Sequence, residues 1–203
     1  MKRLALVPLV LPLLFLPACQ TGPERGVDAA LAVPEAEDWS DIIAPEDAVK
    51  LGARAGTWER ALALTAQENP QLLAAEGALL RPGGAEEAVP PVGTYDCRTI
   101  KLGVQGLGGI AYDPFRCRVF MQDGQTWLVK EAGSQRQSGR IFPDGTFLGG
   151  LALGEEQGSI AYGALDDRDV VGVVERMEDG RYRLIQPQPE YESQLDILER
   201  RAA

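Results

Sequence analysis

The chain between residues 45 and 80 carries the hydrophobic spacing of amphipathic helices. Apolar residues recur at alternating spacings of three and four, which predicts one buried face: Ala48, Leu51, Ala55, Trp58 and Leu62. Pro45 suits the first helical position, and Asn69-Pro70 interrupts the pattern before a second, shorter helix over residues 71–80. Whether the apolar stripe packs on the rest of the domain or binds a partner stays open at this stage.

From Gly93 onward the pattern changes to short segments typical of β-strands, separated by turn residues. Asp123-Gly124 and Asp179-Gly180 are strong hairpin signals. The expected strands cover residues 94–102, 116–121, 126–130, 139–142, 146–153, 159–162, 170–177 and 181–186. About eight strands in an antiparallel meander predict a small barrel or a highly twisted sheet. A short helix over residues 192–200 is expected to close the chain.

The fold class expected is therefore mainly β (α+β), with an N-terminal helical pair. Four segments follow from the pattern: a signal peptide (1–18), a lipidated cysteine and flexible tether (19–38), a helical segment and linker packed on the barrel (39–92), and a disulfide-bridged β domain (93–200).

The N-terminus has the order of a secretory signal peptide. Met1-Lys2-Arg3 is basic, residues 4–16 are almost all apolar, and Ala18-Cys19 marks a cleavage point. This ending resembles the lipobox of bacterial lipoproteins, which implies acylation of Cys19. A plain secreted protein or a single-span anchor is the alternative, but the apolar stretch is shorter than the about 20 residues that cross a bilayer. We expect a lipid-anchored protein facing the periplasm, with the outer membrane favoured over the inner because Gln20 resembles outer-membrane sorting signals. A soluble periplasmic or secreted protein remains the alternative.

The net charge of the chain limits the kinds of partner that it can bind. The formal net charge is −10, and removal of Lys2 and Arg3 with the signal peptide changes it to −12 (−10 − 2). Such an acidic chain has no electrostatic footprint for nucleic acid or for an anionic membrane surface. A membrane would therefore be reached through the lipid anchor, and the remaining partner expected is a protein of the envelope.

Residue types also limit the chemistry. Cys97 and Cys117 remain as a pair if Cys19 is acylated, which favours a disulfide in an oxidising compartment over two buried free thiols. The chain has no histidine, which excludes Ser-His-Asp and Cys-His catalysis and His-ligated zinc or haem. We expect no cofactor, no metal and no catalytic residues, although a carboxylate-dependent hydrolase acting on the envelope stays as a lesser alternative.

Two short segments resemble the motifs of dinucleotide-binding and calcium-binding sites. Residues 106–111 match the glycine pattern of dinucleotide-binding loops, but Pro114 prevents the helix that such a loop must start, so a mobile glycine loop is expected instead. Residues 166–169 hold three acids that could bind calcium, yet they lack the glycine and the distal glutamate of an EF-hand. A solvated turn is the simpler interpretation.

Residues 133–140 form the most unusual polar run of this acidic chain. Ser134, Gln135, Arg136 and Arg140 could donate to a carboxylate or phosphate, because arginine offers paired donors in one plane. The alternative is a loop whose arginines pair with acids of the same domain.

The β part resembles an uncharacterised bacterial family that is catalogued as a domain of unknown function and is typically secreted. The resemblance covers residues 39–199. Its points are Cys97-Arg98-Thr99-Ile100-Lys101-Leu102-Gly103, Phe115-Arg116-Cys117-Arg118, Gly133-Ser134-Gln135-Arg136, Gly139-Arg140, Pro143-Asp144, Phe147-Leu148-Gly149, Asp169-Val170-Val171-Gly172-Val173 and Glu192-Ser193 with Leu195. It implies that Cys97, Cys117 and the Gly-Ser-Gln-Arg run belong to the family pattern. Because Lys101 and Arg116 are cationic residues of that pattern and flank the bridged loop, we expect them near this run. The resemblance implies no activity.

A weaker resemblance links residues 93–97 (Gly-Thr-Tyr-Asp-Cys) and 143–145 (Pro-Asp-Gly) to small periplasmic inhibitors of metalloproteases. This resemblance implies an eight-stranded barrel with an early disulfide, but those inhibitors block with a short N-terminal segment where this chain has helices. The function expected is a non-catalytic binding module for a protein or a small amphipathic ligand, with protease inhibition as the alternative. A barrel interior packed solid with apolar side chains would exclude both the small ligand and the enzyme.

Overall fold

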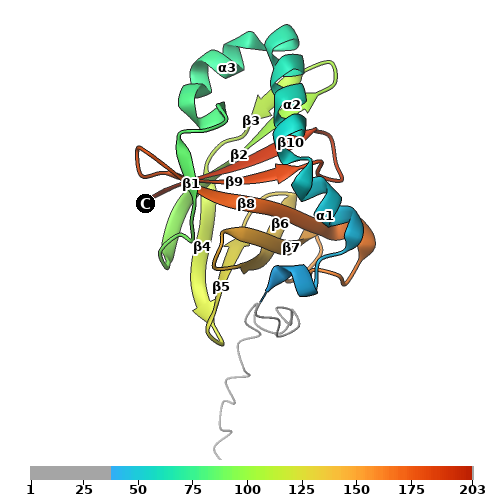
Figure 1. Cartoon of the computed structure of the whole chain (residues 1–203), viewed down its shortest axis with the longest axis vertical. Coiled ribbons are helices and arrows are strands. Elements are labelled where there is room, and N and C mark those ends of the chain that lie inside the picture. The colour runs from blue at the N-terminus through green and yellow to red at the C-terminus, as the bar shows by residue number, and fades with distance from the viewer. Residues whose placement is uncertain (1–37, 203) are drawn as a thin grey trace, which may run out of the picture.

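A closed barrel of eight antiparallel strands forms the centre of the computed structural model, which describes residues 38–202 (Figure 1). The strands follow one another around the ring in chain order, and the last returns to the first. They are β2 (Gly93–Val104), β4 (Phe115–Gln122), β5 (Gln125–Lys130), β6 (Gln135–Ile141), β7 (Thr146–Leu153), β8 (Asp169–Met177), β9 (Tyr182–Pro187) and β10 (Leu195–Ala202). The predicted barrel is confirmed; the predicted signal peptide and Cys19 lie outside the described residues.

Two further strands extend the barrel wall. β1 (Ala85–Glu87) lies in the part of residues 39–92 that was expected to be a linker, and it pairs with β8. β3 (Gly108–Ala111) pairs with the part of β2 that continues beyond β4. The glycine run at 106–109 therefore leads into strand β3. A dinucleotide-binding loop would have to begin a helix there, so this strand agrees with the expectation that no such site is present. The expected mobility of this run is not what its packing indicates, because Thr65 and Glu68 both hydrogen-bond to the backbone of Gly108.

The expected C-terminal helix is wrong, because residues 195–202 form strand β10. Leu195 and Ile197 face the helical layer, whereas Leu198 faces the barrel interior, so both faces of the strand are buried. Such a strand lacks the alternation that identifies a strand in the sequence. β10 pairs with β2 on one side and β9 on the other, so it satisfies two strand edges that would otherwise stay open.

The strand expected over residues 159–162 is also wrong. These residues lie in the loop between β7 and β8, and the eighth strand of the ring is β10 instead. Strand β6 is longer than expected, and it begins at Gln135 inside the polar run that looked like a loop.

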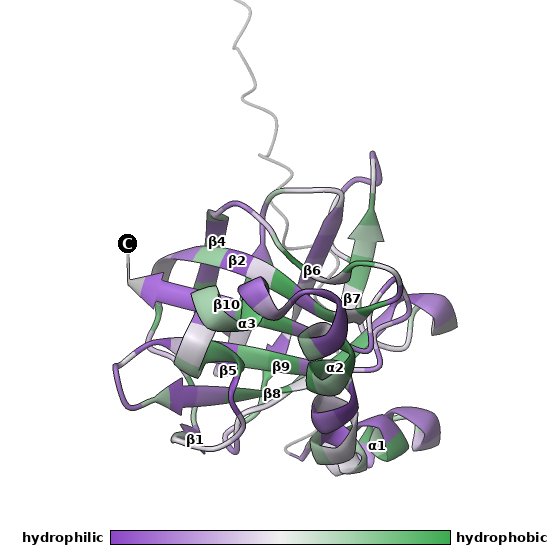
Figure 2. Cartoon of the chain, turned by 90° about the horizontal axis from the view of Figure 1, so that it is seen from above, coloured by the Kyte–Doolittle hydropathy of each residue, from purple (hydrophilic) through white to green (hydrophobic). Residues whose placement is uncertain are grey.

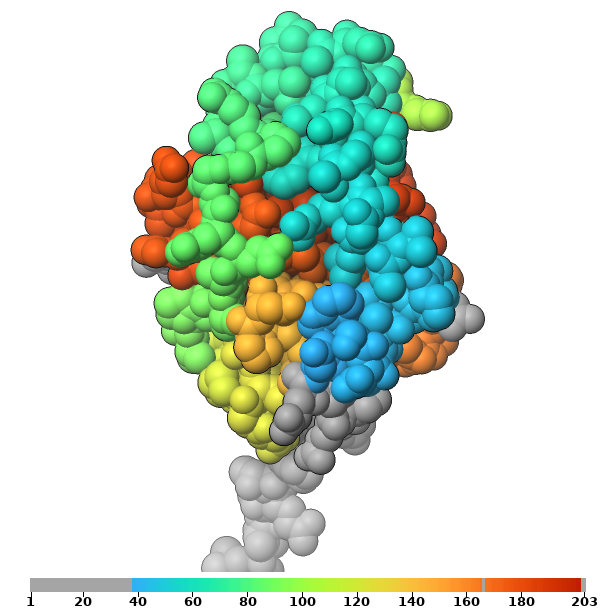
Figure 3. All heavy atoms as spheres, in the orientation of Figure 1, coloured from blue at the N-terminus to red at the C-terminus, as the bar shows by residue number. Residues whose placement is uncertain are grey.

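The helices lie outside the barrel and pack on β2, β3, β8, β9 and β10. In the space-filling view they form one layer in front of the C-terminal strands (Figure 3). The first predicted helix is divided at Ala53 into α1 (Pro45–Gly52) and α2 (Arg54–Glu68). The second is α3 (Pro70–Glu76), followed by a 3-10 turn, η3 (Gly77–Leu80). Seen from above, α2 and α3 lie over β9 and β10 (Figure 2). Trp58 of the predicted stripe is buried there, and Leu51 and Leu62 are partly buried, but Ala48 and Ala55 are exposed, so only part of the stripe packs inward.

The described chain begins at the barrel end that carries the β6–β7 turn. The first element is a 3-10 turn, η2 (Trp39–Asp41), and the Trp39 indole donates to Asp144 Oδ2 of that turn over 2.7 Å. From there α1 runs along the outside of the barrel, where Leu51 packs with Leu148 and Val171.

The barrel interior at this same end is solid. All eight strands contribute to one apolar cluster: Tyr95, Cys97, Cys117, Val119, Leu128, Ile141, Phe147, Val174, Leu184 and Leu198. Gly139 and Gly149 face each other across β6 and β7, and a Cβ on either would lie within 2.7 Å of Phe147 Cζ. The glycine pair thus makes room for the phenyl ring that fills the barrel.

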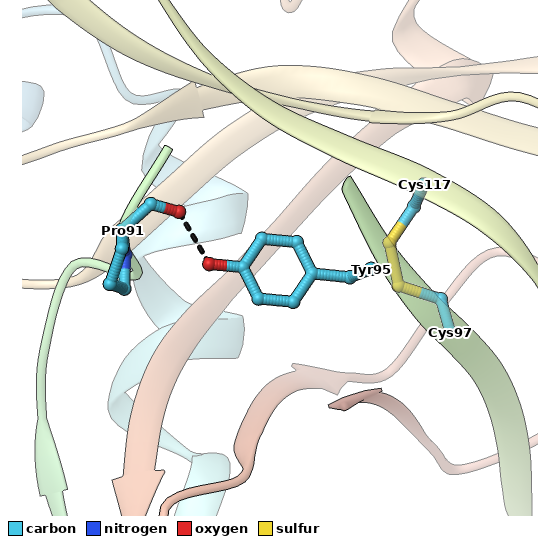
Figure 4. Close-up of a disulfide and its surroundings, with 4 residues drawn as sticks. All are labelled: Pro91, Tyr95, Cys97 and Cys117. Atoms are coloured by element: carbon cyan, nitrogen blue, oxygen red, sulfur yellow. Dashed lines mark hydrogen bonds between the residues drawn. A yellow bond between two sulfur atoms is a disulfide. The ribbon is translucent and has the colours of Figure 1, made fainter. Parts of the chain in front are cut away.

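The predicted disulfide is part of this cluster (Figure 4). Cys97 of β2 and Cys117 of β4 are bonded, with their Cα atoms 6.0 Å apart, and both side chains are fully buried. Tyr95 lies beside them and donates its hydroxyl to the Pro91 carbonyl over 2.5 Å. The bridge therefore links two neighbouring strands of the barrel floor.

Candidate functional site

The other half of the barrel interior is polar, and it opens at the opposite end. Side chains alternate along a strand, so the residues two or four positions from the apolar cluster also point inward. On five strands these residues are polar and line one pocket: Lys101, Lys130, Gln137, Gln186 and Asp196. The cavity volume of this pocket is about 40 Å³. We call this pocket the barrel mouth.

One side of the barrel mouth holds a compact ion pair. Lys101 is 3% exposed, and its Nζ lies 2.9 Å from Asp196 Oδ2 and 3.6 Å from Glu192 Oε2. Ser193 Oγ donates to the other oxygen of Asp196 over 2.5 Å. Burial raises the pKa of Asp196, and the neighbouring Lys101 opposes that effect. The charges of Lys101 and Asp196 therefore largely compensate each other.

Lys130, across the pocket, has no such partner. Its Nζ donates to the Gln135 carbonyl over 2.7 Å and lies 4.4 Å from the centre of the Phe115 ring. It forms no ion pair with any carboxylate of the described residues. Burial lowers the pKa of Lys130 to about 8; Asp196 opposes this shift, and Lys101 and Arg136 add to it. Lys130 is thus the one lysine of the barrel mouth that makes no direct ion pair with a described carboxylate, although Asp196 acts on it from a longer distance.

Two glutamines complete the inner wall. Gln186 Nε2 of β9 donates to Gln137 Oε1 of β6 over 2.6 Å, across the width of the barrel. Amide groups can donate and accept, so they suit the neutral polar atoms of a ligand. Below them the apolar cluster forms the floor, which limits any ligand to a small one.

The β9–β10 loop covers part of the opening in a strained conformation. Gln188 and Glu192 have φ values of +48° and +72°, in the left-handed region that non-glycine residues rarely adopt. The loop is held to the helices, because Lys50 Nζ of α1 lies 2.7 Å from Glu190 Oε1 and Gln188 Nε2 donates to Thr57 Oγ1 over 3.2 Å. The rim of the pocket is therefore built from elements far apart in the sequence.

The structure brings together only some of the residues selected from the sequence. Lys101 and Gln135 line the barrel mouth, and Ser134 lines shallower hollows beside it. Arg136 points outward and donates to the carbonyls of Gly133, Gly154 and Glu156, so its donors serve the loop.

The other two selected arginines lie away from the pocket. Arg140 is 7% exposed and stacks 4.1 Å from the centre of the Phe142 ring. Arg116 is exposed and does not line the barrel mouth. The polar run thus splits between the two faces of β6, because odd-numbered residues point inward and even-numbered residues point outward.

Sequence reasoning missed Lys130, Gln137, Gln186 and Asp196. One signal could have found the first of them. The chain has 20 basic residues, of which only four are lysines (Lys2, Lys50, Lys101 and Lys130), and the last three all line the barrel mouth. Because lysine is rare in this chain, the lysines themselves could have been selected from the sequence as candidate site residues.

The described part of the chain lacks two further features. Residues 38–202 contain no group of three or more potential metal-ligating side chains. None of their helices combines the length and the hydrophobicity needed to cross a bilayer.

The comparisons with known proteins give a family but no relative of known function. No curated protein and no solved structure matches the chain significantly. The family described as Domain of unknown function (DUF4893) matches residues 39–200, from η2 through most of β10. Since this match covers nearly all of the described chain, the protein belongs to the DUF4893 family.

Proposed function

We propose that this protein is a non-catalytic binding module of the cell envelope, and that the barrel mouth holds a small polar ligand with an acidic group. The observation that carries the proposal is Lys130, an inward-facing cation without an ion pair among the described residues. Lys130 is half-buried, so its charge is only partly solvated, and a bound anion would stabilise it.

The size and polarity of the pocket support a small polar ligand over a long amphipathic one. The apolar cluster fills the lower half of the barrel, so no space continues inward for an acyl chain. The ligand would place its acidic group near Lys130 and its neutral polar groups near Gln137 and Gln186. Direct ligand recognition of this kind, with a few polar groups in a preformed pocket, is typical of small-molecule sites.

The proposed location follows from the N-terminal pattern. Export by the signal peptide and acylation of Cys19 would hold the domain at a membrane through residues 20–38, facing the periplasm, with the outer membrane favoured. A protein partner of the envelope would then meet the outer surface of the domain and leave the barrel mouth to the small ligand.

Calorimetric titration with oxalate and with phosphate tests the binding proposal. We expect one of these anions to bind the wild type with one-to-one stoichiometry and to lose at least about tenfold in affinity in Lys130→Gln, a loss of about 1.4 kcal/mol. Arg116→Gln is the matched control, because it removes the same charge from an exposed position outside the pocket. Equal losses in both variants, or none in either, would contradict the proposal.

A further inference from the structure

Lysine and arginine are distributed very differently in this protein. Lys2 lies outside the described residues, and the other three lysines of the chain, Lys50, Lys101 and Lys130, all line the barrel mouth. The ion pairs elsewhere on the described domain use arginine, such as Arg98 with Glu199 and Arg183 with Glu175. Arginine stays protonated in proteins, whereas a lysine can lose its proton and become a nucleophile. Arg168 is the one arginine in the lining of the barrel mouth, and the confinement of the described lysines to this pocket points to a task there that arginine cannot perform.

Among the three lysines, Lys130 is the one placed for such a task. Lys50 contacts the carboxylates of Asp47 and Glu190, and Lys101 contacts those of Glu192 and Asp196. Both ammonium groups are therefore engaged in ion pairs. Lys130 instead lies against the Phe115 ring, forms no ion pair with a described carboxylate, and faces the charge of Lys101.

These surroundings favour the neutral amine. The pKa of Lys130 is lowered to about 8 from the ordinary 10.5, chiefly by burial. At about pH 7.5 this change raises the neutral fraction roughly a hundredfold or more. Desolvation and a neighbouring cation are the two conditions known to activate a lysine amine for attack on carbonyl carbon.

We propose that Lys130 Nζ condenses with the carbonyl group of a small oxo acid in the barrel mouth and forms an imine. This inference rests on the proposed function, since it names the ligand class of the same pocket. An oxo acid carries both the acidic group of the proposed ligand and a carbonyl group that can form an imine, whereas a simple aldehyde lacks the acidic group. The size of the pocket limits the oxo acid to a few carbon atoms.

The reaction needs no further reagent. The nitrogen lone pair forms a bond to the carbonyl carbon while the carbonyl oxygen takes up a proton, giving a carbinolamine. The C–O bond then breaks, water leaves, and a C=N bond forms with loss of the second amine proton. Lys101 and Asp196 line the same pocket, so they can deliver the protons that the departing oxygen needs.

Reductive trapping of the full chain tests this inference. The protein is incubated with glyoxylate and cyanoborohydride, and the label on each lysine is measured by peptide mass mapping. We expect Lys130 to be labelled at least about tenfold faster than Lys50 and Lys101, with a rate that rises with pH and levels off above about pH 8. Labelling of Lys130 no faster than Lys50 would overturn the inference, and this result requires no variant to fold.

Lys130→Arg separates covalent capture from simple binding. Arginine keeps the positive charge but has no amine to condense, so we expect trapping in the pocket to disappear while oxalate still binds. Oxalate binding to both proteins without trapping at Lys130 would refute the imine and leave the proposed function intact. A wild type that shows no trapping at Lys130 and binds neither oxalate nor phosphate would refute both proposals.

Discussion

At the scale of single residues, two arginines show how differently a buried charge can be accommodated. Arg183 and Arg200 are both 0% exposed. Arg183 bonds to Glu175 and to the carbonyls of Leu79, Arg81 and Gly83, and its guanidinium stacks on Trp58. None of the guanidinium nitrogens of Arg200 has a hydrogen-bond partner in the described structure, and its Cζ lies 5.7 Å from the centre of the Tyr182 ring.

Substituting methionine for each arginine should therefore change stability in opposite directions. Arg183→Met leaves Glu175 and three carbonyls without their donor, and we expect a loss of about 3 kcal/mol or more. Burial lowers the pKa of Arg200 to about 10, which still leaves it charged at neutral pH. Arg200→Met removes an uncompensated charge, and we expect a gain of about 1 kcal/mol or more. Urea unfolding measures both; a loss in Arg200→Met would contradict the interpretation of Arg200.

The lowered pKa of Lys130 also predicts a pH dependence of stability. Below about pH 8 both the folded and the unfolded chain hold this proton, and the full cost of the buried charge is present. Between about pH 8 and 10.5 the unfolded chain binds more protons at this group, so stability rises with pH, by about 3 kcal/mol at most.

Lys130→Gln should abolish that rise and be more stable than the wild type at pH 7, as unfolding free energies across this pH range would show. Lys50→Gln is the control, since Lys50 is held by two carboxylates and its loss should leave the rise in place. An unchanged pH profile in Lys130→Gln would indicate that its amine is solvated.

At the scale of elements, the glycine run before β3 determines how closely the helices approach the barrel. Thr65 of α2 donates to the Gly108 carbonyl over 2.7 Å, and Asn69, between α2 and α3, donates to the Gly109 carbonyl over 3.1 Å. A Cβ on Gly109 would lie 2.7 Å from both Leu72 Cδ2 and the Lys101 carbonyl. The contact leaves no space for a side chain.

Gly109→Ala should therefore separate α2 and α3 from the barrel and cost about 2 kcal/mol or more. Gly52→Ala at the end of α1 is the matched control, because a Cβ there meets nothing within 4 Å and the helical preference of alanine should add up to about 1 kcal/mol. Thermal unfolding of the two variants compares them. Equal behaviour of both would show that the helices are not fixed at this contact.

The elements also show what the sequence could predict. Asp123-Gly124 predicted the β4–β5 turn, and both residues have the positive φ that this turn needs. β10 could not be recognised, because Leu195, Ile197 and Leu198 are apolar on both faces of a strand that is covered by helices outside and side chains inside. Local periodicity reports a half-buried strand, whereas full burial is decided by the tertiary structure.

The candidate site was predictable only in part for a related reason. Gln135 and Arg136 are neighbours in sequence, yet one lines the barrel mouth and the other faces outward. Which face of β6 is interior depends on closure of the ring by β10, a pairing between residues about 100 positions apart. The polar run therefore indicated the correct segment of the chain, but neither that it is a strand nor which of its faces is interior.

At the scale of the whole molecule, the disulfide and the solid floor make one rigid end of the barrel. Cys97 and Cys117 are 20 residues apart, and closing a loop of this length is worth roughly 3 kcal/mol in the chain-entropy account. The double variant Cys97→Ala/Cys117→Ala should lose about this much stability in denaturant unfolding. Cys19→Ala is the control and should match the wild type. A loss well under 1 kcal/mol in the double variant would show that strand pairing alone constrains β2 and β4.

The hydrogen bond between Trp39 and Asp144 has a consequence for orientation. It fixes the start of the described chain at the solid end of the barrel, opposite the mouth. With Cys19 acylated as proposed, the tether would lead from that end toward the lipid, and the mouth would be directed away from the bilayer. Its ligand would then arrive from the aqueous compartment and would not be extracted from the membrane.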